Sequence, residues 1–280
     1  MKSTMKIIYE LSKFRISIMS SVSALTGFVL AARGLTWEAV SVIGGVVLLA
    51  CGASALNQVQ EKEIDARMLR TRNRPIPSGR LTAGAALAIA LALLAAGSVC
   101  LAGNTTALAL GLLTVAWYNG VYTPLKRVSP LAAIPGGLVG ALPPMIGWVG
   151  GGGALFDPII VSIAFFFFVW QVPHFWLLLL RIGDDYERAG MPTLTTIFSR
   201  KQLTRVTYVW MVATGVTCMV IPVVLVPGVA IHAALLVASA WLILQATRMV
   251  RSNGKRLAFV EINVYALVVM SLLSLSGFVR

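Results

Sequence analysis

Apolar stretches of about 20 residues recur along this 280-residue chain, separated by short polar breaks. A helix of about 20 apolar residues spans the hydrocarbon core of a bilayer, and a soluble core could not hide so much apolar surface. Only 12% of the residues are charged, against about a quarter in soluble domains. The sequence therefore predicts an all-α membrane protein, a single domain over residues 1–280. We expect about nine transmembrane helices, at 15–32, 39–57, 84–102, 104–121, 131–149, 158–180, 205–226, 229–247 and 261–279.

Lysine and arginine are confined to alternate connections between these stretches. Four precede or open the first stretch, six lie in 57–83, two in 122–130, five in 181–205 and four in 247–257, which places 21 of the 23 on one side. Only Arg33 and Arg280 fall on the other. By the positive-inside rule the basic side is cytoplasmic. With no cleavage site or transit extension visible, we expect a bacterial inner-membrane protein with a cytoplasmic N-terminus.

The net charge and the cysteines bear on two further properties, nucleic-acid binding and disulfide formation. A formal charge of +13 in so apolar a chain indicates loops that face anionic lipid, with no nucleic-acid partner. Cys51, Cys100 and Cys218 lie inside apolar stretches and lack the spacing of a metal site. We predict that they are packing residues without a disulfide.

Three oxygen-bearing side chains stand four residues apart in NQVQEKEID, where the second stretch ends. On a continuing helix Asn57, Glu61 and Asp65 share one face, with roughly 6 Å of rise between neighbours. An amide and two carboxylates suit Mg²⁺, whose coordination is often completed by substrate phosphate. A solvated helix end is the alternative, but stacking Glu61 over Asp65 costs a few tenths of a kcal/mol unless a cation intervenes. This oxygen ladder therefore predicts a magnesium site.

A basic loop, ARMLRTRNRPIPSGR, follows the oxygen ladder. The planar guanidinium of arginine favours phosphate oxygens, although membrane anchoring would explain any single one of these arginines. Beside cation ligands, the cluster predicts a cradle for a diphosphate, and YTPLKR adds residues on the same face. The members are Arg67, Arg70, Arg72, Arg74, Arg80, Tyr122, Lys126 and Arg127.

The sixth predicted helix carries polar residues inside the membrane and at its end. WQVPHFW places Gln171 and His174 beside Pro173, which is expected to kink the helix. Polar groups at this depth are costly unless they face the bundle interior, so they indicate either a functional site or a helix-packing pair. After the helix, Asp184 and Asp185 either pair locally with arginine or face the oxygen ladder and hold a second metal.

Over nearly its whole length the chain resembles the UbiA-type intramembrane prenyltransferases, and within them the branch that acts on haem. The similar segments are NQVQEKEID, RTRNRPIPSGR, YTPLKR, GGLVGALPPMIGW (136–148), WQVPHFW and DDYERAGMP, of which WQ-x-PHF is the most specific to haem. The family's first motif is Asn-x-x-x-Asp-x-x-x-Asp, and here Glu61 takes the middle position. The superfamily's second motif, Asp-x-x-x-Asp, is incomplete because Ala189 follows Asp185 by four residues. Whether a second metal ion binds is therefore left open by the sequence.

The resemblance implies transfer of farnesyl from farnesyl diphosphate to a vinyl group of protohaem IX, with addition of water, giving haem O and diphosphate. It implies Mg²⁺ as cofactor, membrane lipid around the protein, and a haem A synthase or terminal oxidase assembly downstream. Together with the motifs it predicts metal ligation and catalysis by Asn57, Glu61, Asp65 and Asp185, and catalysis by Lys126. Substrate contacts are predicted at Arg67, Arg70, Arg74, Tyr122, Arg127, Gln171, His174, Asp184 and Tyr186.

Three other functions compete with this interpretation. The same fold could prenylate an aromatic acceptor such as 4-hydroxybenzoate or a quinone precursor, but WQVPHF and the incomplete second motif favour haem. A transporter would place charges and broken helices near the bilayer midplane, whereas the acids here cluster at cytoplasmic helix ends. An inactive scaffold in haem synthesis stays open, and an assay with radiolabelled farnesyl diphosphate discriminates it.

Overall fold

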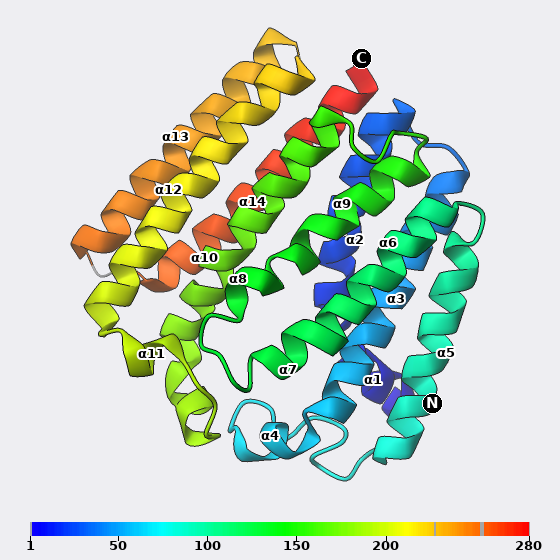
Figure 1. Cartoon of the computed structure of the whole chain (residues 1–280), viewed down its shortest axis with the longest axis vertical. Helices are drawn as coiled ribbons and strands as arrows, with labels where there is room; N and C mark the ends of the chain where they lie inside the picture. Colours follow the sequence, from blue (N-terminus) through cyan, green and yellow to red (C-terminus); the bar gives the residue numbers. More distant parts are fainter. Residues whose placement is uncertain (1, 227, 253–254, 280) are drawn as a thin grey trace.

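The computed structural model describes residues 2–226, 228–252 and 255–279, which form a bundle of long helices (Figure 1). In these ranges eight helical segments are long and apolar enough to span a membrane, so the chain is a multi-pass membrane protein. The segments are α2 (Phe14–Ala32), α3 (Glu38–Gln60), α5 (Ala83–Leu101), α8 with α9 (Ala133–Gly136 and Leu138–Gly150), α10 (Pro158–Arg188), α12 (Arg200–Leu225), α13 (Val229–Ser252) and α14 (Lys255–Val279).

One predicted span, 104–121, is not among these eight segments. It is helical but irregular. α6 (Thr105–Ala116) passes directly into a π-helical segment, η1 (Trp117–Tyr122), and then into a single α-helical turn, α7 (Thr123–Leu125). π-helical turns are rare and occur frequently at functional sites. The all-α fold with about nine membrane helices is thus confirmed, and the irregularity falls where the helix reaches the candidate site.

Several helices extend beyond the predicted boundaries at the end that carries the basic connections. α10 ends at Arg188 instead of 180, α12 begins at Arg200 instead of 205, and α14 begins at Lys255 instead of 261. An apolar stretch marks only the lipid-buried part of a helix, and the helix continues with polar residues where it leaves the lipid. Arg280, predicted on the opposite side, lies outside the described residues. Two short helices were not predicted, α1 (Lys2–Leu11) and α11 (Leu194–Ile197), whereas α4 (Lys62–Arg67) continues the helix on which the oxygen ladder was placed.

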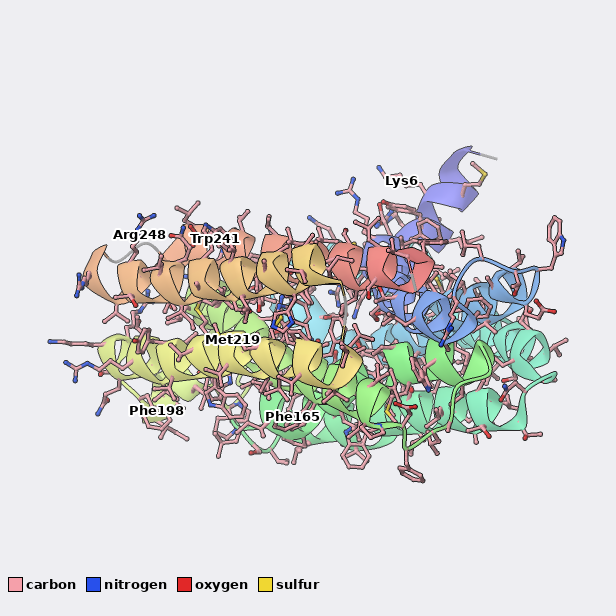
Figure 2. The ribbon with its side chains drawn as sticks, turned by 90° about the horizontal axis from the view of Figure 1, so that it is seen from above. Lys6, Phe165, Phe198, Met219, Trp241 and Arg248 are labelled. Carbon is pink, nitrogen blue, oxygen red and sulfur yellow. The ribbon has the colours of Figure 1, made fainter. Side chains whose placement is uncertain are left out.

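The short helices α1, α4, α7 and α11 gather at one end of the bundle, at the bottom of Figure 1, together with the basic connections. Seen from above, α1 with Lys6 stands away from the remaining helices, whereas Phe165 of α10 lies on the outer surface that lipid covers (Figure 2). The three polar segments singled out in the sequence thus meet at one membrane face.

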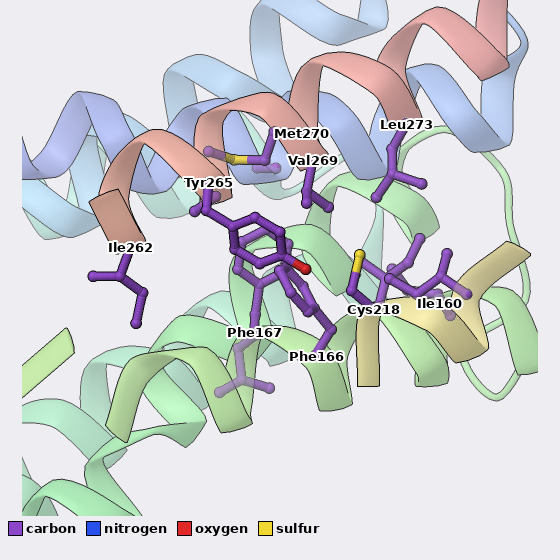
Figure 3. Packing of buried hydrophobic residues seen from close by; sticks show 14 of the residues in the cluster. Ile160, Phe166, Phe167, Cys218, Ile262, Tyr265, Val269, Met270 and Leu273 are labelled. Atoms are coloured by element: carbon purple, nitrogen blue, oxygen red, sulfur yellow. The ribbon is translucent and has the colours of Figure 1, made fainter. Parts of the chain in front are cut away.

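A polar contact is built into the apolar core where α10, α12, α13 and α14 meet (Figure 3). Tyr265 is fully buried, and its ring packs edge-on against Phe166 with 6.0 Å between the centroids. Its hydroxyl lies 3.1 Å from the Ser239 hydroxyl, which satisfies both groups away from water. Cys218 is a free, buried thiol in the same cluster, and Cys51 and Cys100 are also free, as expected of packing residues.

Glycine allows α2 and α9 to cross in direct backbone contact. A Cβ atom on Gly27 would lie 2.0 Å from the Pro144 carbonyl oxygen, and one on Gly147 would lie 1.7 Å from the Ala24 carbonyl oxygen. In lipid, helix association depends on such close packing because the hydrophobic effect between helices is absent. The crossing fixes α2, whose N-terminal end enters the candidate site.

Gly147→Ala should therefore destabilise the protein, because the backbone atom that its methyl group meets cannot rotate away. We expect a loss of about 1–3 kcal/mol in the free energy of unfolding, measured by thermal unfolding in detergent. Gly44→Ala on α3 is the matched control, since no atom lies within 4 Å of the added carbon. Equal losses in the two variants would contradict the importance of the crossing.

Candidate functional site

The oxygen ladder lies at the end of α3 and faces the protein interior. The helix is interrupted only at Glu61, with φ −105° and ψ 11°. Helical hydrogen bonds continue across this break, from the Glu61 amide to the Asn57 carbonyl at 3.0 Å and from the Asp65 amide to the Glu61 carbonyl at 2.8 Å. The side chains of Asn57, Glu61 and Asp65 are buried. The spacing of four therefore places all three on one inward face.

Lys126 and Thr123 bring the end of α7 onto this ladder. The Lys126 ammonium lies 2.7 Å from Glu61 Oε1 in an ion pair and donates a hydrogen bond to Oε2 at 2.7 Å. The Asn57 amide donates to Glu61 Oε2 at 2.9 Å and to the Thr123 hydroxyl at 3.1 Å. Asn57 and Glu61 of the oxygen ladder and Lys126 of the YTPLKR motif thus form one hydrogen-bonded group.

Arg74 belongs to this group, unlike the other arginines predicted in the loop. Its guanidinium donates to both carboxylate oxygens of Asp65, at 2.8 and 2.7 Å. The side chains of Arg67 and Arg70 are exposed, and Arg127 donates to the Gln60 backbone carbonyl. Sequence alone could not separate Arg74 from its neighbours, because only the fold of the loop decides which guanidinium turns inward.

Lys13 is a site residue that the sequence analysis missed. Its ammonium donates to the Asn57 carboxamide oxygen at 2.8 Å, and the residue takes a left-handed conformation, φ 46° and ψ 45°, between α1 and α2. Burial, followed by the nearby charges of Arg74 and Lys126, lowers the pKa of Lys13 from 10.5 to about 7. Its position just before the first apolar stretch made it resemble an ordinary membrane anchor.

The predicted metal ligands form a partial set of donors. Glu61 Oε1 is buried and accepts no hydrogen bond, although the Lys126 ammonium is close. Such an oxygen, beside a second carboxylate and an amide, fits a hard divalent cation. Within the described ranges, however, no three acidic, histidine or cysteine side chains converge on one point. The ladder residues thus fit Mg²⁺ by their chemistry, while their carboxylates are paired with Lys126 and Arg74.

The two aspartates in the last turns of α10 occupy different positions. The Asp185 carboxylate accepts hydrogen bonds from the backbone amides of Leu69 (2.8 Å) and Arg70 (3.2 Å), so it holds the basic loop against the end of α10. Asp184 is exposed and pairs with Arg200 at 2.8 Å, away from the ladder. The structure therefore joins Asp185, but not Asp184, to the segment that follows the ladder.

A stack of aromatic rings lies next to Lys126. Tyr118 packs on Tyr122 with 5.8 Å between ring centroids, and Tyr122 packs on Phe175 of α10 at 5.7 Å and 12°. The Lys126 ammonium lies 5.6 Å from the Tyr122 centroid. Beside this stack is a cavity of about 120 Å³, whose lining includes Tyr122, Lys126, Phe175 and the predicted Tyr186. The charged group thus adjoins an apolar space.

His174 and Gln171 face different neighbours across α10, which runs through Pro173 as one continuous helix. The His174 ring lies between Trp170, 4.9 Å away, and Phe259 of α14, 5.3 Å away by ring centroids. Its Nδ1 atom is buried without a hydrogen-bond partner. Gln171 points toward Gly140 of α9, where any larger residue would meet its amide oxygen. A buried, unpaired imidazole nitrogen is costly in lipid and indicates a site.

Paired charged groups at one end of a bundle of membrane helices, with an aromatic cavity beside them, are an arrangement that suits a substrate with a polyanionic head and an apolar chain. Residues 20–267 match the model of the UbiA prenyltransferase family. The chain belongs to this family and is a prenyltransferase.

Individual proteins agree with this assignment. The chain is 46% identical to the Protoheme IX farnesyltransferase of Geobacter sulfurreducens over 185 residues, covering 65% of this chain and 67% of that protein. Among solved structures, a digeranylgeranylglyceryl phosphate synthase gives a TM-score of 0.81 at 14% identity over all of both chains. A UbiA homologue from Archaeoglobus fulgidus bound to GPP and Mg²⁺ gives 0.69 at 13% identity, covering 98% of this chain and 100% of that one. These structures establish the fold.

Arg74→Ala should be much more damaging than Arg70→Ala. Removing the Arg74 guanidinium leaves the buried Asp65 carboxylate unpaired, which should cost about 3 kcal/mol of unfolding free energy. The exposed Arg70 side chain should change stability by less than about 0.5 kcal/mol. Unfolding is measured in detergent without added Mg²⁺, because a divalent cation could replace the lost charge. Similar losses for the two variants would show that the Asp65–Arg74 pair is not important.

Proposed function

We propose that this protein transfers the farnesyl group of farnesyl diphosphate to a vinyl group of protohaem IX, with addition of water, giving haem O and diphosphate. The observation that carries the proposal is the junction of the buried charged group with the aromatic cavity beside Tyr122. A diphosphate would bind among the charges while its chain lies in the apolar bundle. The farnesyl donor and haem acceptor are supported by the sequence similarity to a Protoheme IX farnesyltransferase.

We propose Mg²⁺ as the cofactor, held by Asn57, Glu61 and Asp65. The buried Glu61 Oε1 atom, which accepts no hydrogen bond, and the UbiA homologue that binds GPP and Mg²⁺ support this. When bound, the ion would neutralise charge on the diphosphate oxygens. Asp185 contributes by holding the basic loop: each of its carboxylate oxygens accepts one backbone amide, which leaves one lone pair on each oxygen for a second ion.

The chain's own cations would then bind and stabilise the leaving group. Lys126, Arg74 and Lys13 lie within one small group and would donate to diphosphate oxygens as the allylic C–O bond breaks and its electron pair passes to diphosphate. The rings of Tyr122 and Phe175 would exclude water from the resulting allylic cation. The vinyl carbon of haem attacks this cation, and the new cation on the haem side takes up water and releases a proton.

The acceptor would lie along the inner face of α10, where Gln171 and His174 are found. The unpaired His174 Nδ1 supports contact with the acceptor, either as an iron ligand or as a donor to a propionate. We also propose that the single domain lies in a bacterial inner membrane with its N-terminus and diphosphate site in the cytoplasm, and that a haem A synthase or terminal oxidase assembly takes the product. The basic residues of the connecting loops support this orientation.

Conversion of protohaem to a heavier, farnesylated haem by the purified protein, followed by mass spectrometry, tests the reaction. Asp65→Ala should lower turnover by about 10²-fold or more, because charge on the leaving diphosphate loses its stabilisation. Glu63→Ala, an exposed acid on the same short helix, is the matched control and should remain active. Glu61→Asp should be the mildest change in the ladder. Full activity of EDTA-treated enzyme would exclude the metal.

His174→Ala should weaken haem binding while leaving farnesyl diphosphate binding nearly normal, because the imidazole lies on α10 facing α14 and not among the ladder side chains. Absorption titration measures haem binding, and a filter assay with radiolabelled farnesyl diphosphate measures the donor. If iron is the contact, the Soret band of bound haem shifts in the variant; a propionate contact leaves it in place. Unaltered haem affinity would remove His174 from the acceptor site.

A further inference from the structure

His174 and Arg181 lie on the same face of α10. They are seven residues apart, which is almost two complete turns and about 10 Å of rise. Both contact one side chain of α14: the Phe259 ring centroid is 5.3 Å from the His174 ring and 5.1 Å from the Arg181 guanidinium carbon. Phe259 therefore marks a strip along the seam between the two helices, with an imidazole at one end and a guanidinium at the other. We name it the α10–α14 strip.

Each end of the strip has hydrogen-bonding capacity that no protein group uses, although the His174 imidazole also has a side-chain hydrogen bond with Asn263. His174 Nδ1 is buried without a hydrogen bond. For Arg181, the structure gives no hydrogen bond or ion pair within the described ranges, and its contact is the face of Phe259. By contrast, Arg74 and Arg127 both donate to oxygen atoms at the candidate site. A guanidinium held in place by an aromatic ring keeps its donors free for a planar carboxylate.

The strip crosses the membrane boundary. α10 has 31 residues, which corresponds to about 46 Å and exceeds the roughly 30 Å hydrocarbon core. Its cytoplasmic end therefore projects from the apolar layer, and Arg181 is exposed whereas His174 is only partly so. A ligand along the strip would have an acidic edge at the membrane surface and an apolar edge about two helical turns deeper.

We propose that Arg181 binds a propionate of the acceptor and so sets the depth at which the macrocycle stands in the membrane. This inference rests on the proposed function, because it takes protohaem as the acceptor. Protohaem carries its two propionates on one side of the ring and its vinyl groups on the other. With a propionate on Arg181, the vinyl side reaches the level of His174 and the adjacent Phe175.

That level is where the reaction needs the vinyl group. Phe175 stacks on Tyr122, and Tyr122 lies next to Lys126. This depth therefore adjoins the charged side chains that we propose bind the diphosphate. Arg181 thereby acts as a positioning and specificity-determining residue, and the propionate role falls to Arg181 instead of His174. The imidazole is then left to face the macrocycle or its iron.

The test compares protohaem with protohaem dimethyl ester, in which both propionates are esterified. In Arg181→Gln, the Kd and KM for protohaem should rise about tenfold or more, as expected for loss of a charge-assisted hydrogen bond. The KM for farnesyl diphosphate should stay within about twofold, which also shows that the variant is folded. For the dimethyl ester, wild type and Arg181→Gln should bind equally. Arg181→Lys should be intermediate, because lysine keeps the charge but not the planar fork.

Arg205→Gln is the matched control, because Arg205 is an exposed cytoplasmic arginine on α12, outside the strip. It should leave the constants for both haems unchanged. Unchanged protohaem affinity in Arg181→Gln would show that Arg181 only anchors the helix to lipid headgroups, and equal weakening of the dimethyl ester would show a structural role; either result overturns the proposal. Haem binding is titrated by absorption without farnesyl diphosphate. A wild type that binds protohaem but forms no farnesylated product would contradict the proposed reaction and still decide the role of Arg181.

Discussion

The pairing of two buried carboxylates with two cations is the interaction on which the polar end of this bundle depends. An unpaired ion removed from water costs several kcal/mol, so Glu61 and Asp65 can stay buried only while Lys126 and Arg74 face them. The partners come from different parts of the chain: α3, the loop after α4, and the end of α7. Three segments are thereby fixed around one point, and Lys13 adds the junction of α1 and α2 through Asn57.

The same group has a third cationic side chain that is not paired with a carboxylate. Glu61 and Asp65 each have their own cation, and Lys13 faces the neutral Asn57 amide with its pKa lowered to about 7. A diphosphate bound there would favour protonated Lys13, and a divalent cation would oppose it. Binding of donor and metal would then be coupled through electrostatics, since each changes the charge that the other meets. The aromatic cavity beside Lys126 would receive the apolar part of the same molecule.

The sequence predicted whatever depends on local periodicity. The nine apolar stretches predicted the membrane helices, because a helix needs about 20 apolar residues to span a bilayer. The spacing of Asn57, Glu61 and Asp65 predicted that they share one face, because residues four apart lie on the same side of a helix. The sequence could not select Arg74 among the loop arginines or anticipate that Asp185 accepts hydrogen bonds from Leu69 and Arg70, since these contacts join segments distant in sequence. Lys13 was missed because its left-handed backbone turns it inward from a position typical of anchors.

The π-helical segment η1 has a consequence for how the site tolerates sequence change. Each residue of an α-helix turns the chain by about 100°, whereas the wider turns of η1 fit one more residue into nearly the same rotation between α6 and the short turn that presents Lys126. Loss of one upstream residue of η1 would therefore convert the segment to ordinary α-helix while Tyr122 and Lys126 keep nearly the same direction. Loss of one residue from the regular helix α6 would instead turn everything after it by about 100°, carrying Tyr122 off Phe175 and Lys126 off Glu61. A deletion is thus tolerated better in the irregular segment than in the regular membrane helix before it.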